Sequence, residues 1–288
     1  MTAMTENEKN RTVGGTLYLV ATPIGNMADI SERAKKVLSE VDFIAAEDTR
    51  HTGLLLSALG ISRPMTSYYK DNMAESGPRI VARLREGESC ALCTDAGMPA
   101  ISDPGEALVR LCADAGVPVT CIPGACAAVT ALALSGADTR SFVFTGFLPT
   151  DGKQRAAALE ELRTEWRTTI IYEAPHRLRR TLDDIVAICA PDRGLAVCRE
   201  LTKLNEEIIR STVADVAARY ENETPRGEYV LVLHGAEVPS QSEDWRGMSV
   251  AEHVALYEAD GMRRMDAIKA VARDRGVSKG EIYKEVSR

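Results

Sequence analysis

The chain has 288 residues, of which 45% are hydrophobic and 27% charged, and its formal net charge is −7. This composition is typical of a globular protein with two domains and room for a small third. The negative charge argues against a protein that holds nucleic acid through a continuous positive surface. No apolar run approaches the ~18 residues of a membrane span, and the polar N-terminus has no signal-peptide core, so we expect a cytoplasmic protein.

Strands alternate regularly with helices along the first half of the chain, and this pattern predicts a mostly parallel sheet. Strands are expected at 16–21, 41–46, 64–68, 90–93 and 117–121. Helices are expected at 30–41 (capped by Asp29 or Ser31), 49–59, 76–86, 106–115 and 125–134. Residues 1–14 are expected to form a disordered tail, and 15–140 an N-terminal α/β domain.

A second α/β domain is expected over residues 141–236. Its strands are predicted at 141–144, 168–172, 195–198, 207–212 and 229–233, and its helices at 153–166 and 176–189. Residues 146–152 have the Gly and Pro content of a linker. The fold class is therefore α/β, with two domains of mostly parallel or mixed sheets and a cleft between them.

The pattern changes near the C-terminus. Residues 237–243 are expected to form a polar linker, and from Val250 onward the pattern is helical. We predict a small extension at 246–288 that contains a helix, a tight Gly turn and a second helix capped by Ser278. Such a unit reads nucleic acid in many proteins, but it is equally a common way to close a small helical bundle.

The seven cysteines indicate packing rather than a metal or redox centre. Most of them lie inside apolar runs, where small core residues are common. Cys90 and Cys93 have the spacing of a metal-binding pair, but no second pair accompanies them. No metal site is predicted.

The stretch from Asp95 to Gly105 combines two Gly, two Pro and two Asp between an expected strand and an expected helix. It is longer than the ~4–6 residues of a typical connection, and open α/β sheets bind ligands at such strand ends. Three other strand ends carry polar or small residues, at 22–26, 46–51 and 123–128. None has the Gly pattern of a dinucleotide or nucleoside-triphosphate site.

The second domain adds charged residues at its strand ends, in the segments 172–177, 199–203 and 226–228. Arg and Glu recur there more often than packing requires. Together with the loops of the first domain they predict an interdomain cleft that binds a ligand with anionic groups and hydrogen-bonding edges.

These strings together resemble the tetrapyrrole methylase family, also called the precorrin-type methyltransferases, and most closely its branch that acts on small-subunit ribosomal RNA. The resemblance spans about residues 15–233 and rests on five strings in order, Thr22–Asn26, Glu47–Arg50, Asp95–Gly105, Phe144–Pro149 and Tyr172–Arg177. Thr94, Met98 and the pair Ala125 and Cys126 depart from the usual residues of that branch.

The resemblance implies an enzyme that binds S-adenosylmethionine in the interdomain cleft, in a homodimer. The implied substrate is the ribose 2′-hydroxyl of a cytidine in the decoding centre of 16S ribosomal RNA, and the acidic charge favours the assembled small subunit over naked RNA. One alternative is a C-methyltransferase that acts on a tetrapyrrole. Another is a non-catalytic protein that binds S-adenosylmethionine or RNA.

The resemblance also implies roles for particular residues. The expected cofactor contacts are Ile24, Asp95, Ala96, Gly97, Met98, Ile101, Ala125, Cys126, Ala174, Leu201 and Gly227. The side chains suited to RNA phosphates are Arg50, Arg177, Arg199 and Lys203. A ribose hydroxyl needs a proton acceptor, for which we expect Asp48 or Glu173, with His51, His176 and Glu200 as alternatives.

Overall fold

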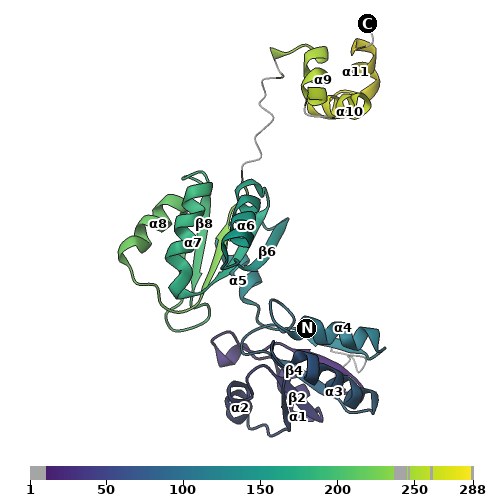
Figure 1. Cartoon of the computed structure of the whole chain (residues 1–288), viewed down its shortest axis with the longest axis vertical. Coiled ribbons are helices and arrows are strands. Elements are labelled where there is room, and N and C mark those ends of the chain that lie inside the picture. Colours follow the sequence, from purple (N-terminus) through teal and green to yellow (C-terminus); the bar gives the residue numbers. More distant parts are fainter. Residues whose placement is uncertain (1–10, 237–244, 246, 260–261, 287–288) are drawn as a thin grey trace, which may run out of the picture. The chain divides into compact units, whose positions relative to one another are not determined.

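The computed structural model describes residues 11–236, 245, 247–259 and 262–286. These residues form two compact units, the first ending at Ala236 in the sequence and the second made of the later residues (Figure 1). The first unit holds two β-sheets, and the second is helical. The expected tail lies outside the described residues over 1–10, as does the expected linker at 237–243. No described helix is long and apolar enough to cross a membrane.

The first sheet is wholly parallel, with the strand order β3-β2-β4-β1-β5. Its strands are β1 (Leu17–Val20), β2 (Phe43–Ala46), β3 (Met65–Ser67), β4 (Cys90–Cys93) and β5 (Val119–Ile122). Its helices are η1 (Met27–Asp29), α1 (Glu32–Glu40), α2 (Thr49–Ala58), α3 (Met73–Arg85) and α4 (Gly105–Asp114). Helices α1 and α2 cover one face, and α3 and α4 the other. Burial on both faces explains why the three central strands, β1, β2 and β4, are nearly continuous apolar runs.

The second sheet is mixed, with the order β6-β7-β10-β8-β9. Its strands are β6 (Phe142–Phe147), β7 (Thr168–Glu173), β8 (Gly194–Arg199), β9 (Glu207–Thr212) and β10 (Tyr229–Leu233). Its helices are α5 (Ala127–Ser135), α6 (Gly152–Thr164), α7 (Pro175–Ile188) and α8 (Val213–Asn222). Strands β6 and β7 are parallel, and the other pairs are antiparallel.

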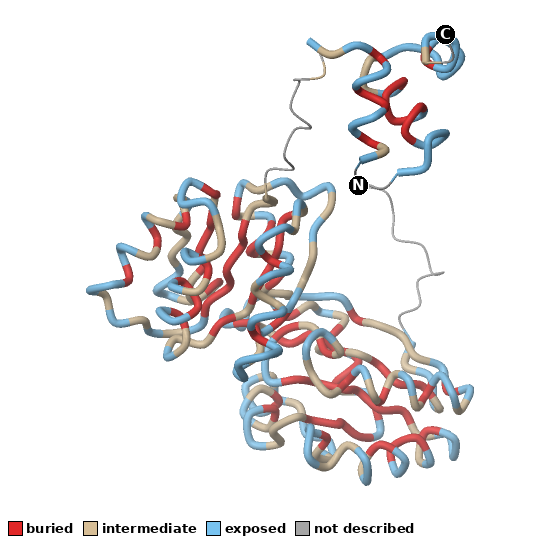
Figure 2. The backbone as a smooth tube through the Cα atoms, turned by 45° about the horizontal axis from the view of Figure 1, so that its top comes forward, coloured by how far each residue is buried: buried red, intermediate tan, exposed pale blue. Residues whose placement is uncertain are grey.

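Helices cover both faces of the second sheet as well. Helices α6, α7 and α8 pack on one face, whereas α5 packs on the other. Buried stretches accordingly run through the strands of both sheets (Figure 2). The predicted α/β class with two sheets is therefore confirmed.

Two local features differ from the sequence prediction, and a third decides between two predicted helix caps. Helix α8 was not predicted, although the Thr212 hydroxyl caps it by accepting the N–H of Asp215 at 3.2 Å. Strand β6 continues to Phe147, into the segment that was expected to be a linker. Of the two expected caps of α1, Ser31 is the one used, and it accepts the N–H of Ala34 at 3.1 Å.

The second unit consists of α9 (Val250–Ala259), α10 (Arg264–Asp274) and α11 (Lys279–Val286) around a small apolar core. Arg275 ties its helices together by donating from Nη2 to the Met248 carbonyl at 2.7 Å. Ser278 accepts the N–H of Glu281 at 3.3 Å, as expected of a helix cap. The helix-turn-helix shape is present, and its core is that of a closed small bundle.

Candidate active site

The loops that follow β1 and β4 are joined to each other at the carboxyl edge of the first sheet. Thr22 and Gly97 exchange two backbone hydrogen bonds, of 2.9 and 3.2 Å. The Asp103 carboxylate braces the second loop by accepting the N–H groups of Ile101 and Gly105, at 3.2 and 2.7 Å. Asp95 accepts the N–H of Asp48 at 3.2 Å and so ties this loop to the one after β2. Both aspartates therefore hold the backbone of the site.

Two glycines let these loops touch the second sheet. A Cβ on Gly25 would lie 2.4 Å from Cγ of Lys203, so only glycine allows this approach. Gly146 has φ +63°, and a Cβ there would lie 2.9 Å from Oγ of Ser102. The described non-glycine residues with positive φ lie in two of the contacting loops. Ala100 and Ser102 are in the loop after β4, and Glu200 and Thr202 are in the loop after β8. Strained backbone of this kind clusters at functional sites.

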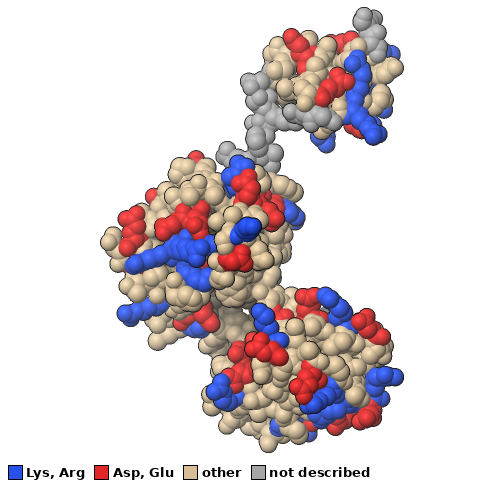
Figure 3. All heavy atoms as spheres, viewed as in Figure 1, with Lys and Arg blue, Asp and Glu red and all other residues tan. Residues whose placement is uncertain are grey.

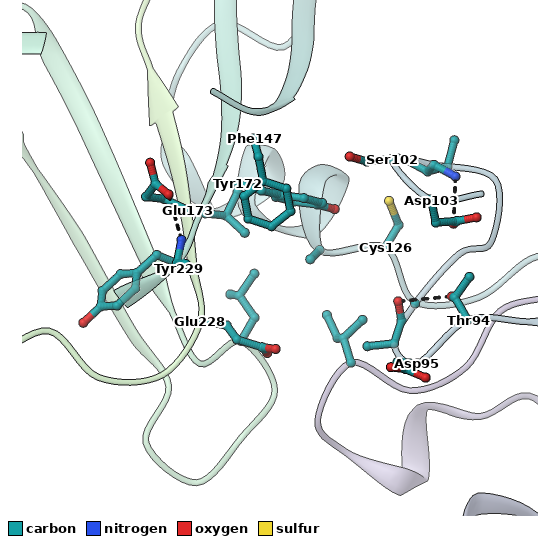
Figure 4. A pocket seen from close by; sticks show the side chains of 18 of the residues that line it. Thr94, Asp95, Ser102, Asp103, Cys126, Phe147, Tyr172, Glu173, Glu228 and Tyr229 are labelled. Carbon is teal, nitrogen blue, oxygen red and sulfur yellow. Dashed lines mark hydrogen bonds between the residues drawn. The ribbon is translucent and has the colours of Figure 1, made fainter. Parts of the chain in front are cut away.

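A pocket of about 680 Å³ lies between these loops and the second sheet (Figure 4). This size is within the ~300–1,000 Å³ typical of small-molecule sites. All the cofactor contacts expected from the sequence line it except Ala125 and Gly227. Ala125 packs in the apolar cluster beneath the pocket, and Gly227 lies against the Glu200 side chain.

Glu173 lines the pocket, but its carboxylate is already engaged. The residue is 2% exposed and accepts hydrogen bonds from the Thr181 hydroxyl at 2.5 Å and from the N–H of Ala174 at 2.9 Å. The Arg177 guanidinium lies 3.3 Å from the same carboxylate and also donates to the Leu148 carbonyl. Glu173 and Arg177 therefore brace the pocket wall.

Asp48 does not line the pocket. It caps α2 by accepting the N–H of Arg50 at 2.8 Å, and its carboxylate pairs with the Arg50 guanidinium at 2.6 Å. The hydrogen bonds from Arg50 hold the pKa of the Asp48 carboxyl well below its usual range. A carboxylate stabilised in this way is a weak proton acceptor.

Glu47, the residue before Asp48, does line the pocket. Among the described residues it takes part in no ion pair, and the N–H of Asp95 lies 3.5 Å from its Oε2. Burial raises the pKa of the Glu47 carboxyl above its ordinary value, and the nearby charges of Asp95 and Asp103 raise it further. Glu47 is thus a half-buried carboxylate with a raised proton affinity, a combination found at catalytic sites.

Lys203 belongs to a charged cluster on the rim of the pocket. Its Nζ lies 2.9 Å from Glu200 and 2.8 Å from Glu228, and the carboxylate of Glu228 lines the pocket. Glu200 itself does not line the pocket, and its Oε1 also accepts the N–H of Glu228 at 3.0 Å. The cluster fixes the turn that carries Glu228.

The remaining expected residues lie at different places. His176 is exposed at the start of α7 and lines the pocket, whereas His51 is exposed on α2 and does not. Arg199 lies outside the lining, where its Nε donates to the Arg226 carbonyl at 2.9 Å. Arg50 is exposed beside Asp48, with 90% of its side chain accessible.

Sequence reasoning missed several lining residues, chiefly Glu47, Ser102, Phe147, Tyr172 and Glu228. All except Ser102 stand at or next to the end of a strand, Glu228 directly before the first residue of β10. For the aromatic pair the available signal was the string Phe144–Pro149 followed by Tyr172. Within the described part of the chain, no group of His, Cys, Asp and Glu is placed to hold a metal ion.

The comparisons with known proteins agree with this geometry. Residues 16–217 match the family described as Tetrapyrrole (Corrin/Porphyrin) Methylases. A protein of Halalkalibacterium halodurans named ribosomal RNA small subunit methyltransferase I is 47% identical over 93% of this chain and 93% of its own. Proteins with the same name from Bacillus subtilis and Escherichia coli O157:H7 are 44% and 41% identical, over 93% and 94% of both chains.

Solved structures share the fold. A uroporphyrin-III C-methyltransferase from Thermus thermophilus superposes with a TM-score of 0.56 at 23% identity, over 76% of this chain and 94% of its own. A cobalt precorrin-4 methyltransferase gives a TM-score of 0.57 at 18% identity, over 76% and 95%. The chain belongs to the tetrapyrrole (corrin/porphyrin) methylase family, and within it to the group of its relatives named ribosomal RNA small subunit methyltransferase I.

Proposed function

We propose that this chain is an S-adenosylmethionine-dependent methyltransferase that acts on 16S ribosomal RNA, at the ribose 2′-hydroxyl of a cytidine in the decoding centre. The observation that carries this proposal is the similarity, over 93% of the chain, to relatives named for methylation of small-subunit ribosomal RNA. The pocket supports it, because the strings of the RNA-methylating branch form its walls. The assignment of the ribose 2′-hydroxyl and of the cytidine base rests on the resemblance.

The residues of the pocket fit the cofactor. S-adenosylmethionine is a net cation with a sulfonium centre, and it supplies an activated methyl group when bound. The pocket offers apolar side chains from Ile24, Met98 and Leu201 and acidic ones from Asp95 and Glu228. A structure of the uroporphyrin-III C-methyltransferase of Thermus thermophilus, with a TM-score of 0.53 at 17% identity, is a complex with S-adenosylhomocysteine. Its likeness shows the shared fold, and we infer that this pocket takes the same class of ligand.

Glu47 is the carboxylate best placed to accept the proton. Transfer forms a bond between the ribose oxygen and the methyl carbon, breaks the methyl–sulfur bond and returns its electrons to sulfur, while the hydroxyl proton passes to the base. Glu47 lines the pocket without an ion pair among the described residues, whereas Arg50 engages Asp48 and Thr181 engages Glu173. The proton-acceptor roles expected of Asp48 and Glu173 stay predictions, which replacing each residue by Ala and measuring methylation of small subunits would test.

We further propose that the protein is a homodimer, as the resemblance implies, and that it acts in the cytoplasm. Sedimentation would measure its oligomeric state. Figure 3 shows acidic and basic side chains interspersed on the face in view. With a net charge of −7, such a surface favours recognition of the shape of an assembled subunit over attraction to bare RNA. Arg50, the most exposed of the cations expected to bind RNA, is the first candidate for a phosphate contact.

Labelled methyl transfer tests this function directly. We expect incorporation from S-[methyl-³H]adenosylmethionine into small subunits that lack the modification, with naked 16S RNA a poorer substrate and uroporphyrinogen inert. Nuclease digestion and mass spectrometry of the product would locate the methyl group on the cytidine ribose. Methylation of uroporphyrinogen alone would instead assign a tetrapyrrole C-methyltransferase. Cofactor binding without transfer to any substrate would indicate a non-catalytic protein.

Cysteine labelling tests where the cofactor binds. Burial raises the pKa of Cys93 to about 12 and those of Cys112 and Cys198 to about 11, so these thiols should resist iodoacetamide at neutral pH. Cys126 lines the pocket and is partly exposed, so we expect it to be alkylated in the free protein. S-adenosylhomocysteine should slow that alkylation, as read by peptide mass spectrometry. Equal labelling of Cys126 with and without this ligand would place the cofactor elsewhere.

A further inference from the structure

Phe147 is a large apolar side chain that lines the pocket and remains exposed to solvent. It is 52% exposed although it lines the pocket, and its ring meets the ring of Tyr172 edge to face, with centroids 5.7 Å apart and planes at 64° (Figure 4). Tyr172 packs in the same manner against Phe144, at 5.0 Å and 71°. An edge-to-face contact leaves a face of Phe147 free to meet a ligand.

A bulge in β6 turns Phe147 toward the pocket. In a regular strand, residues three positions apart point to opposite faces of the sheet. The register of β6 against β7 pairs Phe144 with Ile170 and Phe147 with Tyr172, because Thr145 is an extra residue between two successive pairs. Phe144, Phe147 and Tyr172 therefore share one face, and it is the face that meets α5 and Ile24.

The surrounding structure holds this bulge in place. Gly146 adopts the left-handed conformation that a bulge favours, and it packs closely against Ser102. After the strand, Arg177 donates to the Leu148 carbonyl and Arg155 donates to the Pro149 carbonyl at 3.1 Å. These contacts fix the backbone on both sides of Phe147 and so hold its exposed ring in place.

We propose that Phe147 is the stacking platform for the nucleobase of the target nucleotide. Enzymes that act on a base draw the target nucleotide out of its stack, and a pocket that encloses one ribose of a folded RNA is filled best by a nucleotide drawn out in the same way. Splayed bases in RNA are recognised by stacking on aromatic side chains, which substitutes for the lost neighbours. The pocket offers such a ring at its opening, already fixed by Tyr172. This inference rests on the proposed function and names a residue that positions its substrate.

Substitution of Phe147 tests the proposal. Phe147→Ala should lower kcat/KM for small subunits by about 5- to 150-fold, the factor that corresponds to ~1–3 kcal/mol per stacked base. Most of the loss should fall on KM for the subunit, whereas the Kd for S-adenosylhomocysteine, measured by calorimetry, should stay within about twofold. Phe147→Tyr should retain activity, and Phe147→Leu, which keeps apolar volume without a ring, should not.

Phe142 provides the matched control. It is 43% exposed on the same strand and does not line the pocket, so Phe142→Ala should leave kcat/KM unchanged. Full activity of Phe147→Leu would overturn stacking, and a parallel loss of S-adenosylhomocysteine affinity would assign Phe147 to the cofactor instead. Wild-type protein that left subunits unmethylated would overturn the proposed function and the nucleobase with it. An active wild type with an undiminished Phe147→Ala variant would overturn the stacking alone.

Discussion

Replacement of Glu47 by Gln is expected to lower kcat for methylation of small subunits by about 10²–10⁴-fold, the usual worth of a positioned proton acceptor. The amide keeps the size of the side chain and removes its basicity. In the wild type, kcat should fall as the pH drops through the pKa of Glu47, which burial raises above 4.5. Only the ionised carboxylate can take the proton, so this acid limb should disappear from the pH profile of Glu47→Gln.

Two further variants make the result specific. Glu106→Gln changes an exposed carboxylate on α4 that pairs with Arg110 and should leave kcat unchanged. Asp48→Asn tests the neighbouring acid; asparagine can still cap α2 through its side-chain oxygen, so the helix should keep its cap and the acid limb should stay in place. A Glu47→Gln enzyme with full activity, beside an inactive Asp48→Asn enzyme that still binds S-adenosylhomocysteine, would reverse the assignment.

Replacement of Arg155 by Ala should destabilise the first unit by about 3–5 kcal/mol, because it removes a buried guanidinium that pairs with the partly buried Asp184. Arg155 is 4% exposed, and its guanidinium lies 2.6 Å from Asp184 and 2.9 Å from the Thr181 hydroxyl. Thr181 in turn donates to Glu173, so the loss reaches the pocket wall. For a unit of this size the change corresponds to a fall in Tm of roughly 6–20 °C, which calorimetry would measure.

Arg163 is the control for this variant, since it lies on the same helix in an exposed pair with Glu160. Arg163→Ala should change the free energy of unfolding by no more than ~0.5 kcal/mol. A Tm for Arg155→Ala that matched the Tm of Arg163→Ala would show that the buried network contributes little to stability.

Most of the fold was predictable because the pattern of apolar residues changes period at nearly every element. Strands β9 and β10 begin and end at the predicted residues, and both sheets form as expected. Helix α8 was missed because its short amphipathic pattern follows a strand without any Gly or Pro to separate the two. The predicted strand at 141–144 is shorter than β6, because Gly146 suggests a turn in the sequence, whereas in the sheet Gly146 is part of a bulge.

The site was predictable in its backbone and less so in its chemistry. The strings at strand ends located the loops, since parallel strands bring their carboxyl ends to one edge. Which side chain of the pair Glu47 and Asp48 faces the pocket depends on where the strand stops, and that is the least certain feature of any strand. The string Phe144–Pro149 pointed to the segment of Phe147, but the face of the sheet on which Phe147 lies follows from the register shift, for which Gly146 is the one local sign.

Helix α5 has a consequence for how the protein is made. It precedes the whole second sheet in the chain, yet Ala128, Ala131 and Leu132 complete the apolar layer on that sheet beside Val230 and Val232. During synthesis this layer is therefore complete only when β10 emerges, about a hundred residues after α5. The first sheet and the helices on its faces are complete by Ile122, whereas α5 stays uncovered until the second sheet forms, so a chain cut near residue 140 would leave an apolar helix exposed to aggregation.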